Sequence, residues 1–184
     1  SLRWNDDGKN NNDFDAHCKE PRGNEIYYAN KNNYQTTGML DVDIINPNGQ
    51  VAVENITWSD INKMNNGEYH FFVENYNDRG GKGGFYAEIE YDGDIHSYAY
   101  GKSLRHKENV TVARIKFDRT NGVQFIEELP STLSPKTMWG IKTNQFHPVN
   151  LVMFSPNYWY QSDQVGNKHY FFMLSDCQNI NQPN

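Results

Sequence analysis

Aspartate alternates with apolar residues at two places in this sequence. The two pairs are Asp13 with Asp15 and Asp41 with Asp43. If each stretch is a β-strand, its carboxylates lie on one face and its apolar side chains on the other, because successive side chains of a strand point to opposite faces. Two such strands side by side would bring four carboxylates onto one surface, where facing like charges destabilise a sheet. A hard cation with oxygen ligands would offset that repulsion, so the sequence predicts a Ca²⁺ site.

Two further residues belong to this candidate site. Glu54 is a fifth carboxylate, and it fits because Ca²⁺ takes about six to eight oxygen ligands. His17 lies on the acidic strand face and would join a Mn or Zn site. Alternatively, the aspartates bind no metal and are solvated residues on an open sheet face, paired with Lys31 or Arg22. Because aspartate is disfavoured in strands, two Asp-x-Asp strands favour the cation.

A zinc site is a second candidate for metal binding. Its four ligands would be Cys18, Cys177, His17 and His169. However, His17 and Cys18 are neighbours in a predicted strand, so their side chains diverge. The calcium site is therefore preferred to this zinc site.

Acid and base catalysis is a third kind of chemistry that these residues allow. A glycosidase needs two carboxyl groups at a fixed separation. Glu54, Glu88 and Glu90 are available, but nothing in the sequence fixes a distance between any two of them. A hydrolase with an acidic active site is thus an alternative function.

Aromatic residues suggest a carbohydrate-binding module as another alternative. The tryptophans are Trp4, Trp58, Trp139 and Trp159, and tyrosines are plentiful. Aromatic rings on an exposed sheet face stack on sugars, whereas core packing is the commoner role of tryptophan in a sandwich of this size. Trp58 and His17 are the residues that we expect to contact such a ligand.

The composition excludes several partners. The 184 residues carry a net charge of −6, with scattered basic residues and no basic patch between aromatics, so nucleic acid is not an expected partner. No apolar run is long enough for a transmembrane helix. Hydrophobic residues make up only 36% of the chain, but the aromatic share of 14% argues for a folded core.

Short alternating segments separated by turn signals dominate the chain. The turn signals include Asn46-Pro47-Asn48-Gly49, Asp92-Gly93 and Asn121-Gly122. Strands at this spacing predict an antiparallel, all-β sandwich of jelly-roll type, with helix limited to short turns. Residues 168–174 are apolar on both faces, which is typical of a covered strand, and Pro148 and Pro156 bracket a further segment at 149–154. We therefore expect a sandwich domain at 1–130 and an extension at 131–184 that packs on the same core.

The order of motifs over residues about 1–100 resembles a known family. The motifs are Trp4-Asn5, Asp13-Phe14-Asp15-Ala16-His17, Pro21-x-Gly23, Ile26-Tyr27-Tyr28, Asn30-Lys31, Leu40-Asp41-Val42-Asp43, Val53-Glu54-Asn55-Ile56-x-Trp58 and Gly67-x-Tyr69. Together they resemble the YfaP-like β-domains of bacterial and phage proteins, although Phe14 and Ala16 stand where that pattern has leucine. The resemblance implies a β-sandwich with a secreted, surface or accessory role and no established activity. The Asp-x-Asp opening also resembles the calcium-binding start of tellurium-resistance-type sandwiches.

The expected function combines these indications. The chain begins at Ser1 without a methionine, so we expect part of a larger bacterial or phage protein. Two free thiols fit a reducing compartment, which favours the bacterial cytoplasm or a phage particle over secretion. The sequence predicts a non-catalytic binding or interaction module with a Ca²⁺ site and a protein or carbohydrate ligand.

Overall fold

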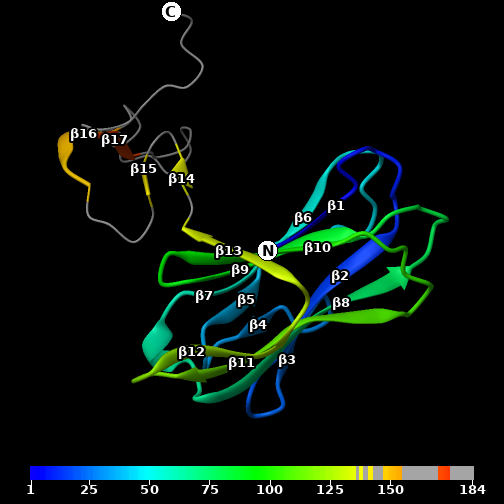
Figure 1. The fold of residues 1–184 in the computed structure, drawn as a ribbon, viewed down its shortest axis with the longest axis horizontal. Helices are drawn as coiled ribbons and strands as arrows, with labels where there is room; N and C mark the ends of the chain where they lie inside the picture. Colours follow the sequence, from blue (N-terminus) through cyan, green and yellow to red (C-terminus); the bar gives the residue numbers. More distant parts are fainter. Residues whose placement is uncertain (136, 139–140, 143–146, 155–169, 175–184) are drawn as a thin grey trace, which may run out of the picture. The chain divides into compact units, whose positions relative to one another are not determined.

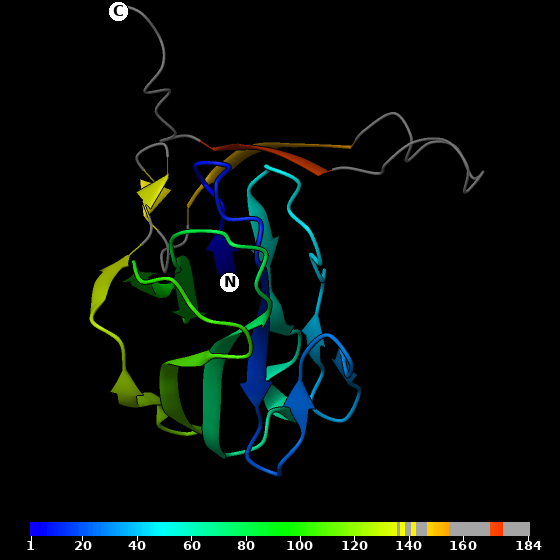
Figure 2. The same ribbon diagram turned by 90° about the vertical axis from the view of Figure 1, so that its right-hand side faces the viewer.

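The computed structural model of this chain describes residues 1–135, 137–138, 141–142, 147–154 and 170–174. It divides into two compact units, Ser1–Tyr91 with Ile95–Leu133 and Asp92–Asp94 with Ser134–Asn184. The only helical segment in the described part is one 3₁₀ turn, η1, at Ile61–Lys63. The other described elements are strands (Figures 1 and 2). The predicted all-β, antiparallel fold is confirmed, and jelly-roll connectivity stays a prediction.

Two five-stranded sheets build the sandwich. The first has the order β13-β10-β9-β1-β6, with bounds Ser131–Pro135, Asp94–Tyr100, Phe85–Tyr91, Leu2–Trp4 and Ala52–Glu54. The second has the order β12-β11-β8-β2-β3, with bounds Gly122–Glu128, Asn109–Asp118, Gly67–Asn77, Asp13–Lys19 and Glu25–Ile26. A three-stranded sheet has the order β4-β5-β7, at Asn32–Asn33, Gly38–Leu40 and Ile56–Trp58.

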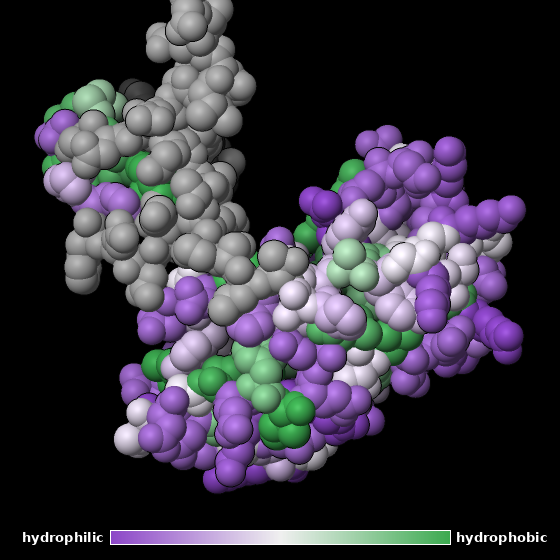
Figure 3. All heavy atoms as spheres, viewed as in Figure 1, coloured by the Kyte–Doolittle hydropathy of each residue, from purple (hydrophilic) through white to green (hydrophobic). Residues whose placement is uncertain are grey.

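The buried apolar core lies between the two five-stranded sheets. Phe14 of β2 contacts Trp4 of β1 and Phe85 of β9, with ring centroids 5.9 and 6.4 Å apart. These rings come from both sheets and are at most 2% exposed, so the sheets face each other across them. Hydrophilic residues cover most of the visible face of this unit (Figure 3).

Strand β2 shows the predicted alternation but departs from it in burial. Phe14 and Ala16 belong to the core, as expected. Asp13, Asp15 and His17, on the opposite face, are also buried. Buried polar side chains need hydrogen-bond or charge partners. The groups that surround these three side chains are described with the candidate site below.

The turn between β9 and β10 has the geometry that Asp92-Gly93 predicts. Both residues have positive φ, 49° for Asp92 and 84° for Gly93. Two-residue hairpin turns of this kind match the right-handed twist of their strands. The sequence prediction of this hairpin is therefore confirmed.

The described part of the C-terminal unit consists of two short ribbons. One pairs β14, Thr137–Met138, with β15, Ile141–Lys142, and the other pairs β16, Val149–Phe154, with β17, Tyr170–Leu174. The prediction that β17 is core is wrong here, since Phe172 is 60% exposed and Met173 52%. Among the described residues, no third strand pairs with this ribbon, and a two-stranded ribbon alone cannot bury both of its faces. The packing of residues 131–184 on the sandwich core stays a prediction.

Candidate metal centre

Glu54, at the end of β6, connects the two halves of the candidate site. Its side chain is buried, and its Oε2 accepts a hydrogen bond from the Ala16 amide at 2.9 Å. Its Oε1 accepts one from the Ile44 amide, also at 2.9 Å. The next strand, β3, pairs with β2 only at Cys18 and Lys19, which leaves the β2 edge open at Ala16. The Glu54 carboxylate therefore takes the place of a neighbouring strand at that edge.

Three carboxylates meet at this point. One oxygen each from Asp15, Asp43 and Glu54 lies within 4.8 Å of the others, and we call these three residues the triad. Asp15 is 3% exposed, and its Oδ2 finds no hydrogen-bond donor among the described residues. A buried carboxylate oxygen without a donor is costly, so its position beside two further carboxylates calls for a cation or a proton.

Asp13 extends this acidic group along the same face of β2. Its Oδ1 is also buried and without a donor in the described part of the chain. Its Oδ2 lies 3.7 Å from Nη2 of Arg79. Asp43 lies 3.2 Å from Nζ of Lys31, which was the predicted alternative partner. Only two cationic side chains, Arg79 and Lys31, thus lie close to the four carboxylates of Asp13 and the triad in the described part of the chain.

The electrostatics of the group agree with this geometry. Burial is the main cause that raises the pKa of Asp15 to about 8, and the charges of Glu54, Asp13, Asp43 and Glu74 contribute to the same rise. Burial likewise raises the pKa of Glu54 to about 7, against the lowering effect of its two amide hydrogen bonds. For Asp13, burial raises the pKa to about 6 although Arg79 lowers it. Without a counterion, these groups cannot all stay ionised at neutral pH.

Asp41 lies outside the triad, and the strand predicted for residues 39–44 is wrong beyond Leu40, where β5 ends. The Asp41 Oδ1 accepts hydrogen bonds from the amides of Val42, at 2.6 Å, and Asn55, at 2.9 Å. Side-chain bonds of this kind offer the backbone an alternative to sheet pairing. Residues 41–44 are consequently irregular, and Asp43 reaches Glu54 from a loop.

His17 is not a member of the triad. Its Nδ1 lies 2.7 Å from Oε1 of Glu25, and its ring stacks between Tyr27 and Phe72. Burial lowers the pKa of His17, which keeps the imidazole neutral. The structure gives no support to a Mn or Zn site at His17, and Cys177 and His169 of the predicted zinc site lie outside the described residues.

The two described tryptophans are structural. The Trp58 ring packs edge-on against Tyr69 and Phe71, and its Nε1 donates a hydrogen bond to Glu20 at 3.0 Å. Trp4 is 1% exposed and donates to the Asn12 carbonyl. The tryptophan platform for sugars is thus not formed by these two rings, and Trp139 and Trp159 lie outside the described residues.

Glu20 is a buried carboxylate that the sequence did not point to. It accepts four side-chain hydrogen bonds, from Asn24, Asn33, Thr36 and Trp58, at 2.5 to 3.0 Å. The donors come from separate loops and strands, and no local spacing indicates them. Glu20 is thus a structural carboxylate that the fold surrounds with donors. Asp15 Oδ2, by contrast, has no donor among the described residues.

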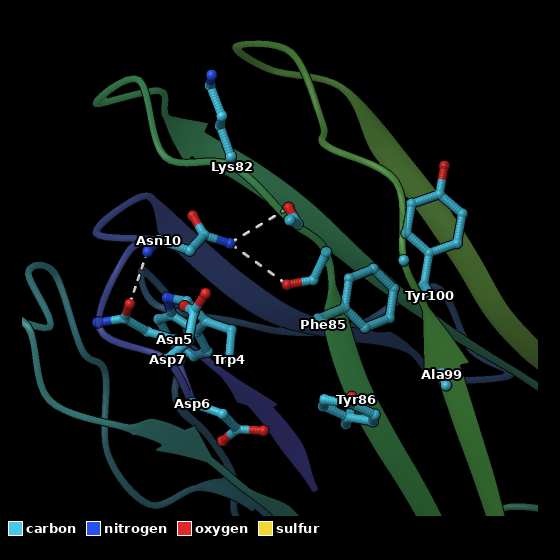
Figure 4. A pocket seen from close by; sticks show the side chains of 13 residues that line it. Trp4, Asn5, Asp6, Asp7, Asn10, Lys82, Phe85, Tyr86, Ala99 and Tyr100 are labelled. Carbon is cyan, nitrogen blue, oxygen red and sulfur yellow. Dashed lines mark hydrogen bonds between the residues drawn. The ribbon is translucent and has the colours of Figure 1, made fainter.

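A surface cavity of about 260 Å³ lies apart from the triad (Figure 4). Asn10 closes one side, with its Nδ2 donating to the carbonyls of Gly83 and Gly84 at 3.3 Å, while the rings of Phe85 and Tyr100 form another side. A second cavity of about 190 Å³ is lined by residues such as Arg3 and Tyr86. Neither cavity is lined by Asp13, Asp15, Asp43 or Glu54.

Comparison with protein-family models, curated proteins and solved structures finds no match for this chain. The resemblance to YfaP-like domains therefore rests on the motifs alone. In the part of the chain that the structure describes, no helix is long and apolar enough to cross a membrane.

Proposed function

We propose that this chain is a non-catalytic binding module in which a Ca²⁺ ion, held by Asp15, Asp43 and Glu54, ties the loop at 41–45 to the open edge of β2. The observation that carries the proposal is the Asp15 Oδ2 atom, which is buried, lacks a donor in the described residues and shares the triad with two more carboxylates. The order of motifs supports placing the module in a larger bacterial or phage protein.

The donor set supports calcium over softer metals. All three ligand candidates are carboxylates, and Ca²⁺ prefers oxygen ligands. Sulfur and imidazole, which favour zinc or copper, are absent from the triad. A divalent cation would convert the mutual repulsion of these carboxylates into attraction between β2, β6 and the loop.

The burial of two of the three triad residues supports binding over hydrolysis. Asp15 is 3% exposed and Glu54 1%, so a substrate has no access to them. A hydrolase would place its catalytic carboxylate in a concave pocket, and no carboxylate of the triad lines either of the two cavities above.

Calorimetric titration with calcium tests this proposal. We expect binding to the wild-type chain and none to Asp15→Asn or Glu54→Gln. Asp41→Asn is the matched control, because Asp41 lies in the same loop as Asp43 but outside the triad. At 100 times its dissociation constant, calcium should add about 2.7 kcal/mol to the free energy of unfolding. Absence of binding heat together with an unchanged unfolding curve would overturn the proposal.

A further inference from the structure

A row of aromatic rings lies on the outer face of the second sheet, opposite the core. On β2 and β8, the outward residues His17 and Phe72 are register partners, as are Lys19 and His70. Tyr27 and Tyr28 follow β3, and Tyr76 is outward on β8. We define the outer aromatic cluster as His17, Tyr27, Tyr28, His70, Phe72 and Tyr76. None of these six belongs to the apolar cluster between the sheets.

The rings of this cluster contact one another in an unbroken series. The centroid distances are 5.0 Å for His70–Phe72, 4.6 Å for Phe72–His17, 5.3 Å for His17–Tyr27, 5.0 Å for Tyr27–Tyr28 and 5.0 Å for Tyr28–Tyr76. The middle members are buried by their neighbours, whereas Tyr76 is 37% exposed and Tyr27, Tyr28 and His70 are half-buried. Ring surface is therefore open to solvent at the two ends of the series and closed at its middle.

Charged groups flank the rings in neutral pairs. Lys107 Nζ lies 3.2 Å from Glu74 Oε1 and 3.2 Å from the centre of the Tyr76 ring. Lys19 Nζ lies 3.9 Å from Glu25 Oε2 and 5.3 Å from the centre of the Phe72 ring. Each lysine is thus matched by a glutamate, and its ammonium lies over a ring, so Lys107 covers one face of Tyr76 and the other face is the one considered for stacking.

These features distinguish between classes of ligand. A polyanion needs unpaired positive charge, but both lysines are paired and the chain carries a net charge of −6. The core of a protein interface is rich in aromatic residues but poor in lysine and glutamate. The outward positions of β2 and β8 hold no aliphatic side chain and include Lys19 and Glu74. A neutral sugar chain fits, since its C–H faces pack on rings and its hydroxyls bond to paired charges.

We propose that the outer aromatic cluster binds a neutral oligosaccharide, with Tyr28 and Tyr76 as the main stacking residues. This inference rests on the proposal that the chain is a binding module, because it names the ligand class of that module. It does not depend on calcium binding, since none of the six cluster residues belongs to the triad.

Affinity electrophoresis in native gels tests the inference. The gels contain a soluble neutral polysaccharide, namely arabinoxylan, galactomannan, dextran or hydroxyethylcellulose, or contain heparin as the polyanion. We expect at least one neutral polysaccharide to retard the wild-type chain, and Tyr76→Ala or Tyr28→Ala to weaken binding roughly tenfold or more. Tyr34→Ala is the matched control, because Tyr34 is 86% exposed and outside the cluster. It should migrate like the wild type in every gel.

Three results would overturn the inference: no retardation by any of the neutral polysaccharides, retardation by heparin alone, or retardation that Tyr76→Ala leaves unchanged. Near-ultraviolet circular dichroism of each variant confirms that the fold is intact. Gels run with calcium and with chelator separate the two proposals. Retardation without calcium binding would support the oligosaccharide site and contradict the calcium site. Calcium binding without retardation would support the calcium site and contradict the oligosaccharide site.

Discussion

At the scale of single residues, two buried carboxylates with opposite surroundings define the chemistry of this chain. Glu20 accepts four side-chain hydrogen bonds, whereas Asp15 Oδ2 accepts none from the described residues. Alternation in the sequence pointed to Asp13, Asp15, Asp41 and Asp43, and Glu54 was added as a further carboxylate. The structure groups Asp15, Asp43 and Glu54, with Asp43 reaching the group from a loop. The sequence could not predict Glu20, because the donors that surround Glu20 are assembled by the fold.

The pH dependence of stability tests the state of Asp15 and Glu54. Their folded pKa values, about 8 and about 7, lie above those of the unfolded chain. The folded state therefore holds more protons between about pH 4 and 8, and its stability falls as the pH rises through that window. In chelator, urea unfolding should show a loss of more than ~1 kcal/mol from pH 5 to 8.

Asp15→Asn should flatten this slope, because the amide does not titrate. Saturating calcium should remove most of the loss in the wild type by stabilising the ionised form. Stability that rises with pH in chelator would contradict the raised pKa values.

Substitution of Glu20 tests the structural carboxylate. Glu20→Ala leaves the partly buried donors of Asn24, Asn33 and Trp58 without their acceptor, and it also removes the acceptor of the buried Thr36 hydroxyl. We expect a loss of about 3 kcal/mol or more in the free energy of unfolding, measured with urea. Glu90→Ala, at an exposed position of β9, is the control and should change stability by less than about 0.5 kcal/mol. Equal effects of the two substitutions would show that the Glu20 network contributes little.

At the scale of elements, turns were more predictable than strand ends. Asp92-Gly93 carries its own conformational preference, so the hairpin follows from local sequence. The strand at 39–44 looked equally regular, yet it ends at Leu40 because the Asp41 side chain bonds to nearby amides. The exposure of β17 was also missed, because an apolar pattern alone does not show which layer covers a strand.

A glycine substitution tests the hairpin directly. Gly93 has φ 84°, where a β-branched side chain is strained. Gly93→Val should therefore lower the free energy of unfolding by ~1 kcal/mol or more. Gly101→Val is the control, because Gly101 is not in the left-handed region and a Cβ there meets no atom within 4 Å. Equal melting temperatures for the Gly93 and Gly101 variants would contradict the turn geometry.

At the scale of the whole molecule, the described core is complete within the N-terminal part of the chain. Its fully buried members lie between Leu2 and Phe117, and the partly buried side chains packed on it end at Leu129. We therefore expect a chain truncated after Leu133 to melt cooperatively, as followed by circular dichroism. Loss of cooperative melting would show instead that residues 134–184 complete the core, as the apolar pattern of the sequence predicted.

The most direct test of the cation proposal is a crystal structure determined with millimolar calcium. The account predicts one ion bonded to carboxylate oxygens of Asp15, Asp43 and Glu54 at about 2.3–2.6 Å, with an anomalous signal that identifies calcium. Asp41 should stay outside its coordination sphere. Carboxyl groups of the triad joined only by shared protons or by water, at the same calcium concentration, would contradict the proposal.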